Sequence, residues 1–145
     1  MPTQDPNLLD GLFRLSFLLQ ARLSRIAAEH DLSVVQVRLL GILRDREPGM
    51  LALARHLELE KSSLSGLVDR AEKRGLVERI PSTSDRRAAT IRVTAQGRKL
   101  ARVIEEAVSA EVDALVQVLP EADRRRLAAL IGRVVLASEP RSASS

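Results

Sequence analysis

The chain has 145 residues, of which 45% are hydrophobic and 1% aromatic, and it carries a net charge of +4. This length suits one domain or one lobe of an obligate dimer, and the scarcity of aromatics favours a helical core of Leu, Val, Ile and Ala. The absence of Cys excludes a disulfide scaffold, a Cys-ligated zinc site, an iron–sulfur cluster and a thiol switch.

The segment from Asn7 to about His30 has the pattern of a long amphipathic helix. Its apolar residues recur at three- and four-residue steps, at Leu8, Leu12, Leu15, Leu19, Leu23 and Ile26. Phe13 and Phe17 lie on a neighbouring stripe and widen this apolar face. A partner subunit and a broad intramolecular core would each explain such a face.

Three shorter helices are predicted next, over about residues 33–46, 51–57 and 61–74. Ser33 begins the first of them, and Gln36 follows at the spacing of a capping box. Pro48 and Gly49 end that helix, and Gly75 stands in the position that ends the third.

After Gly75 the apolar period changes to that of strands. Strands are predicted at residues 76–81 and 89–94, a polar hairpin tip at 82–88, and long helices at about 94–118 and 120–137. Both of these helices have wide apolar faces. The predicted fold class is therefore mainly α, of the α+β type.

The sequence offers no catalytic or membrane-spanning pattern. We find no nucleophile–base pair, metal cluster or phosphate-binding loop, so we expect neither enzyme activity nor a metal or cofactor. No apolar run approaches the ~20 residues of a membrane span, and a signal pattern is absent. We expect a soluble, cytoplasmic protein.

Positive charge is concentrated in one segment. Between Lys61 and Lys99, ten Lys or Arg residues stand against four Asp or Glu, a balance of +6, whereas the rest of the chain has a balance of −2. A concentrated basic segment is typical of proteins that bind polyanions, although a solubilising surface patch would give the same count.

The order helix, short helix, helix and hairpin is that of a winged helix-turn-helix, in which the second helix of the pair enters the major groove of DNA. In the helix over residues 61–74, Leu64, Leu67, Val68 and Ala71 share one face. The residues of this helix predicted to contact DNA are Ser62, Ser63, Ser65, Gly66, Arg70, Lys73 and Arg74. Gly66 would permit close approach to DNA, and Lys73 would neutralise Asp69 four residues before it. A merely solvated face is the alternative.

The hairpin tip is the second predicted contact with DNA. Arg86 and Arg87 at the end of the ribbon can reach a minor groove, and Asp85 would hold a guanidinium in one orientation. A solvated turn would explain these three residues alone. Together with the helix, they favour double-stranded DNA as the partner.

The stretch from Ser63 to Arg79, SLSGLVDRAEKRGLVER, resembles the recognition helix and first wing strand of the MarR family of bacterial transcriptional regulators. Asp85-x-Arg87, followed by Val93-Thr94-x-x-Gly97, is similar to the wing signature of that family. The resemblance implies a single MarR-like domain over residues 1–145, with a winged helix-turn-helix lobe at 33–94 and a helical dimerisation region at 7–30 and 95–138.

The resemblance also implies a function. A homodimer would bind a pseudo-palindromic operator, with Arg87 in the minor groove, and would repress nearby genes. A small anionic or phenolic ligand would release it, and Arg14, Arg22 and Arg38 are candidates for binding that ligand. The alternatives are a winged-helix module that binds another protein and a regulator that responds to no ligand.

Two residues depart from the family pattern. Glu60 stands where a Ser-type cap usually begins the recognition helix, and Met50 stands where the turn before the preceding helix often has a hydroxyl residue. Both helix starts are therefore expected to be less firmly capped.

Overall fold

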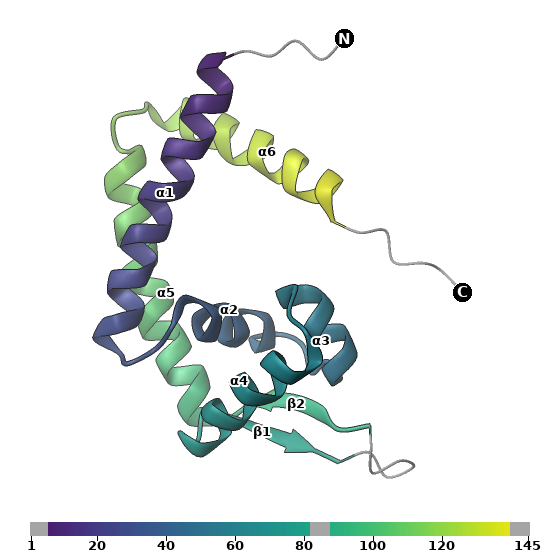
Figure 1. Ribbon diagram of the computed structural model, residues 1–145. Helices are drawn as coiled ribbons and strands as arrows, with labels where there is room; N and C mark the ends of the chain where they lie inside the picture. The colour runs from purple at the N-terminus through teal and green to yellow at the C-terminus, as the bar shows by residue number, and fades with distance from the viewer. Residues whose placement is uncertain (1–5, 82–87, 140–145) are drawn as a thin grey trace. The chain divides into compact units, whose positions relative to one another are not determined.

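The computed structural model describes residues 6–81 and 88–139 (Figure 1). Its elements are α1 (Pro6–Glu29), α2 (Val34–Leu43), α3 (Met50–Leu57), α4 (Lys61–Lys73), β1 (Val77–Ile80), β2 (Thr90–Val93), α5 (Ala95–Val116) and α6 (Glu121–Ser138). The predicted fold class, mainly α with one small hairpin sheet, is confirmed.

The chain divides into two compact units, at residues 1–109 and 110–145, with the boundary inside α5. The first unit contains α1 to α4, both strands and the start of α5; the second contains the end of α5 and α6. The assignment of residues 33–94 to a DNA-binding lobe and of 7–30 and 95–138 to dimerisation stays a prediction.

Local signals in the sequence place the ends of α2 and α4. Ser33 and Gln36 form the predicted capping box, because the Gln36 amide donates to Ser33 Oγ (3.2 Å) and the Ser33 amide donates to Gln36 Oε1 (2.9 Å). At the end of α4, Gly75 has a φ of +72°. Its amide donates to the Glu72 carbonyl, and the Leu76 amide donates to the Ala71 carbonyl. This Schellman arrangement satisfies the last carbonyl groups of the helix and turns the chain into β1.

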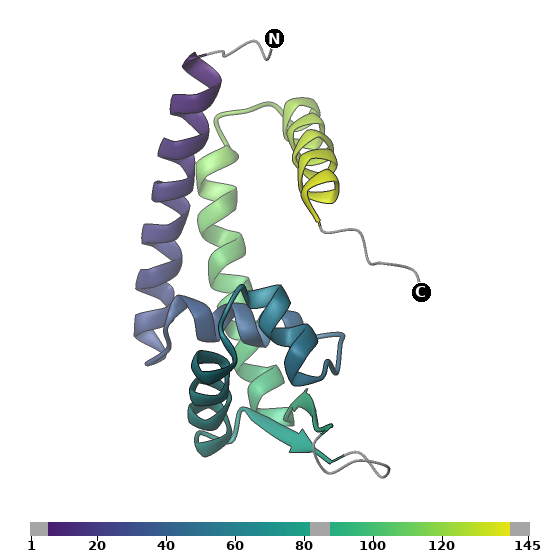
Figure 2. The ribbon, with the colours of Figure 1, turned by 45° about the vertical axis from the view of Figure 1, so that its right-hand side comes forward.

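The two strands form an antiparallel ribbon in which Val77 pairs with Val93 and Arg79 pairs with Ile91. Val77, Ile91 and Val93 are buried, so one face of the ribbon packs on the core. The Ile91 amide donates to the Pro48 carbonyl (2.9 Å), which joins β2 to the turn before α3. In Figures 1 and 2, α4 lies beside the ribbon.

The core of the first unit is aliphatic. Its largest fully buried side chains come from α2, α3, α4 and the ribbon, and are Leu39, Leu43, Leu53, Leu64, Val68, Val77 and Ile91. The α4 residues Leu64, Leu67, Val68 and Ala71 are all buried. The face of α4 predicted to pack inward is therefore confirmed, and the opposite face is turned away from the core.

Thr94 and Gly97 join the ribbon to α5. Thr94 Oγ1 accepts from the Gly97 amide (3.0 Å) and donates to the Gly75 carbonyl (2.6 Å), which confirms Thr94 as the residue that caps α5. Gly97 is buried, and a Cβ built on it would lie 2.0 Å from the Leu76 carbonyl oxygen. Only glycine permits this approach of α5 to Leu76, the residue that precedes β1.

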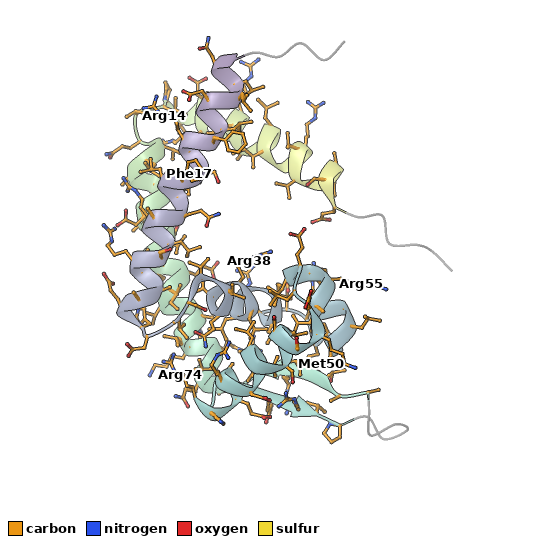
Figure 3. The ribbon with its side chains drawn as sticks, in the orientation of Figure 1. Arg14, Phe17, Arg38, Met50, Arg55 and Arg74 are labelled. Atoms are coloured by element: carbon orange, nitrogen blue, oxygen red, sulfur yellow. The ribbon has the colours of Figure 1, made fainter. Side chains whose placement is uncertain are left out.

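Two helices, one in each unit, carry most of the exposed large apolar side chains. On α1 these include Leu8, Leu9, Leu12, Phe13 and Phe17, with Phe17 70% exposed (Figure 3). On α6 they include Leu130, Ile131, Val134, Val135 and Leu136. No described helix, however, is both long and apolar enough to cross a membrane.

Candidate nucleic-acid interface

The outward face of α4 carries the small and basic side chains that the sequence places there. Ser62, Ser63, Arg70 and Lys73 are exposed, and Ser65 and Gly66 are partly buried. These predicted contact residues therefore lie together on one helix, away from its buried face. Hydroxyls and cations on an exposed helix face suit contacts with base edges and phosphate oxygens.

Gly66 and Arg70 lie next to each other on this face, one turn apart. A Cβ built on Gly66 would lie 3.3 Å from Arg70 Nη1, the end of a flexible side chain, and not against backbone. The fold of the first unit therefore does not require glycine at this position.

The start of α4 has the weak cap that the sequence predicts. Glu60 is the N-cap residue, and its side chain makes no capping hydrogen bond. The start of α3 is similar, because its N-cap is Gly49, which has no side chain to offer.

Arg74, predicted as a DNA contact, follows the last residue of α4 (Figure 3). Its side chain contacts the chain just after α1. Its Nη1 donates to the Asp31 carbonyl (2.8 Å), and its Nη2 donates to the His30 carbonyl (3.0 Å). These bonds tie the end of α4 to the connection between α1 and α2. A contact of Arg74 with DNA stays a prediction.

The partner of Asp69 differs from the predicted one. Among the described residues, Arg79 of β1 pairs with Asp69 through Nη2 and Oδ1 (2.6 Å), and Lys73 does not. The i to i+4 rule favours Lys73 within an isolated helix, but the ribbon brings a guanidinium to the same carboxylate. The hydrogen bond to Asp69, partly opposed by desolvation, raises the pKa of Arg79 above its ordinary value.

The hairpin-tip residues Asp85, Arg86 and Arg87 lie outside the described residues, and their contacts stay predictions. The described end of the hairpin at Ala88–Thr90 borders a hollow of about 740 Å³ between α3, the start of α4 and β2. Ser65, Lys61 and Arg55 lie on its wall. The hollow therefore adjoins the predicted reading face of α4.

A separate, mainly apolar pocket of about 220 Å³ lies between α1, α2 and α5. Its lining is Leu23, Val37, Leu40, Gly41, Arg44, Ala101, Ile104, Glu105 and Val108. Arg44 Nη1 and Glu105 Oε1 form an exposed ion pair there (2.8 Å). This pair is the charged feature of the pocket, and sequence reasoning missed it.

The predicted ligand residues Arg14, Arg22 and Arg38 do not line this pocket. Arg14 pairs with Asp10 on the exposed surface of α1 (3.6 Å). Arg38 donates to the His56 carbonyl at the end of α3 (3.3 Å). Figure 3 shows Arg14 on α1 and Arg38 on α2. A ligand contact for any of the three stays a prediction.

Comparisons with known proteins identify the family. A sequence model of the MarR family matches residues 30–88. The transcriptional regulator PecS of Dickeya dadantii is 34% identical over 90% of this chain and 81% of its own length. FarR of Neisseria gonorrhoeae is 32% identical over 82% of this chain and 84% of its own length. Both relatives are HTH-type transcriptional regulators.

A solved structure agrees with this result. NadR, crystallised with 4-hydroxyphenylacetate, matches with a TM-score of 0.72 and 28% identity, over 92% of this chain and 97% of its own. The match extends through the helices that flank the winged part as well as the winged part itself. The predicted resemblance is confirmed, and the chain belongs to the MarR family, whose members are DNA-binding transcription regulators and not enzymes.

Proposed function

We propose that this protein is a sequence-specific repressor that binds double-stranded DNA as a homodimer. The observation that carries the proposal is the outward face of α4, where exposed Ser62, Ser63, Arg70 and Lys73 lie opposite a fully packed inner face. Such a helix can lie in a major groove, with Ser and Arg side chains on base edges and phosphates.

The exposed apolar faces of α1 and α6 support the homodimer. A soluble single chain rarely leaves side chains such as Phe13 and Phe17 this exposed on one helix, so a second copy is the occupant that suits them. Two copies related by a two-fold axis would place two α4 helices in successive major grooves. The operator would then be pseudo-palindromic, with half-sites about 10 bp apart.

We also propose that a small aromatic carboxylate binds the pocket at Arg44 and lowers the affinity for DNA. The pocket volume of about 220 Å³ suits a single-ring molecule, and its walls are mainly aliphatic. A ligand carboxylate would take the place of Glu105 on the Arg44 guanidinium. The related NadR was crystallised with 4-hydroxyphenylacetate, a ligand of this kind.

Selection of duplexes from a random pool with the full chain tests the function. We expect an inverted repeat, protected by one dimer, and a binding constant that falls steeply with salt, by roughly one unit of log–log slope per phosphate neutralised. Recovery of no duplex, together with salt-independent binding of a protein partner, would favour the interaction module instead. Placement of the recovered site in front of a reporter gene should lower transcription if the protein is a repressor.

A further inference from the structure

Arg79 occupies an unusual place in the ribbon. Side chains two residues apart in a strand share a face, so Arg79 lies in the same inward row as Val77. The residues opposite them, Ile91 and Val93, are buried in the core. An arginine therefore ends a row of aliphatic side chains, and its own side chain is only 30% exposed. The aliphatic stem of arginine suits such a row, provided that its charged end finds partners.

The charged end of Arg79 finds two carboxylates on α4. Its Nη2 lies 2.6 Å from Asp69 Oδ1, and its Nη1 lies 2.8 Å from Glu72 Oε1. The Arg79 amide also donates to Glu72 Oε2 (3.4 Å). A planar guanidinium can hold two carboxylates at once in a set orientation, which an ammonium cannot. Arg79 thus links the first wing strand to two successive turns of α4.

The carboxylates of Asp69 and Glu72 lie at the side of the outward face of α4, next to the predicted DNA contacts. Asp69 and Glu72 follow Ser65 at spacings of four and seven residues, so the three side chains form one stripe along α4. Unpaired carboxylates at this position would repel phosphate as the helix entered a groove. Paired with Arg79, they form a compact group whose formal charge is −1 instead of −2.

We propose that Arg79 is a positioning residue for DNA binding, which masks Asp69 and Glu72 and sets the orientation of the wing relative to α4. Arg79 acts through these two side chains and need not contact DNA. The proposal rests on the proposed function as a DNA-binding protein.

The ribbon offers a matched control on its other face. Arg92 pairs with Glu78 across the strands, with Nη2 to Oε1 at 2.6 Å and Nε to Oε1 at 2.9 Å. This pair has the same guanidinium–carboxylate chemistry, with one carboxylate where Arg79 has two, and it does not involve α4. Arg92→Gln therefore removes one guanidinium and one ion pair from the ribbon without releasing the helix.

The test compares affinities for a duplex selected by the wild-type chain and for a mixed-sequence duplex of the same length. We expect Arg79→Gln to weaken binding of the selected duplex about tenfold and Arg92→Gln to weaken it only about twofold. Arg79→Lys should fall between wild type and Arg79→Gln, because an ammonium can mask one carboxylate but cannot bridge both. Circular dichroism of each variant establishes that binding is measured well below its unfolding temperature.

A second substitution separates positioning from direct contact with DNA. Asp69→Asn should tighten binding in the Arg79→Gln background, because it removes an unmasked carboxylate, and should give no such gain in wild type. Tightening of equal size in both backgrounds would overturn the proposal, as would equal losses for Arg79→Gln and Arg92→Gln. If the wild-type chain bound no duplex, the DNA-binding function itself would fail, and that outcome is distinct from any of these.

Discussion

Gly97 in the first turn of α5 lies against the backbone of Leu76, so closely that a Cβ on Gly97 would be 2.0 Å from the Leu76 carbonyl oxygen and 2.9 Å from the carbonyl carbon. Gly97→Ala should therefore lower the free energy of unfolding by about 3 kcal/mol, because α5 must move away from the Leu76 backbone. Chemical denaturation measures this loss.

Gly41→Ala is the matched control for Gly97→Ala. Gly41 lies inside α2, and a Cβ there would meet nothing within 4 Å. We expect this variant to raise the free energy of unfolding by about 0.5–1 kcal/mol, through the better helix propensity of alanine. If Gly97→Ala and Gly41→Ala changed the free energy of unfolding by similar amounts, the contact with Leu76 would not require glycine at position 97.

Gly66→Ala should separate stability from DNA affinity. The nearest atom to a new Cβ is the movable end of Arg70, so the helix should gain about 0.5–1 kcal/mol in stability. The new methyl group would stand on the outward face of α4 and keep the helix away from the bases, so affinity for the selected duplex should fall. Thermal unfolding and a binding titration test the two effects, and a stabilised variant with unchanged affinity would contradict the role of Gly66 in close approach.

Substitutions at the N-caps of α2 and α4 should change the free energy of unfolding in opposite directions. Ser33→Ala removes the capping box of α2 and should cost about 1 kcal/mol, whereas Glu60→Ser supplies the side-chain acceptor that α4 lacks and should add up to about 1 kcal/mol. Both effects are measurable by urea denaturation. A loss of stability in Glu60→Ser would mean that Glu60 stabilises α4 in another way.

The exposed face of α1 should determine the association state. Phe17→Asp places a charge in the proposed dimer interface, so sedimentation should show a monomer or a fold that survives only at high protein concentration. Leu51→Asp is the control, because Leu51 of α3 is 69% exposed and lies on another element. A folded wild-type monomer at micromolar concentration, or a Phe17→Asp dimer of unchanged affinity, would exclude the proposed interface.

Substitutions of Arg44 and of Glu105 should change the affinity of the pocket for its ligand in opposite directions. Calorimetric titration with 4-hydroxyphenylacetate should show about tenfold weaker binding in Arg44→Gln, because a charge-assisted hydrogen bond is lost. Glu105→Gln should bind the ligand more tightly, because its carboxylate no longer competes for Arg44. Arg125→Gln, which breaks an exposed ion pair with Glu121 on α6, should behave as wild type. If Arg44→Gln and Glu105→Gln changed the affinity for the ligand in the same direction, the ligand carboxylate would not be taking the place of Glu105 on Arg44.

Features that depend on neighbouring residues could be predicted from the sequence. The buried face of α4 follows from the helical period of Leu64, Leu67, Val68 and Ala71, and the end of the helix follows from Gly75. The capping box at Ser33 is likewise encoded within four residues. In each case local backbone geometry decides the outcome, so no knowledge of the tertiary structure is needed.

Features that depend on the packing of distant elements could not be predicted in this way. Arg44 and Glu105 are 61 positions apart and meet only because α2 packs beside α5. Arg79 is ten positions from Asp69, and the pairing requires the turn at Gly75 to bring the ribbon to the flank of α4. One signal was present, since an arginine in the inward row of a strand needs a charged partner. The contacts of Asp85, Arg86 and Arg87 remain predictions.

The hydrogen bonds of Arg74 bear on how the protein responds to ionic strength. Among the residues that the structure describes, its guanidinium is held by the uncharged carbonyl groups of His30 and Asp31 and by no carboxylate. Dissolved ions screen attraction between opposite charges far more than they weaken a hydrogen bond to a neutral peptide group. The end of α4 therefore stays anchored in concentrated salt, and a salt titration of DNA binding reports the release of ions from phosphate rather than the loosening of the helix that reads the bases.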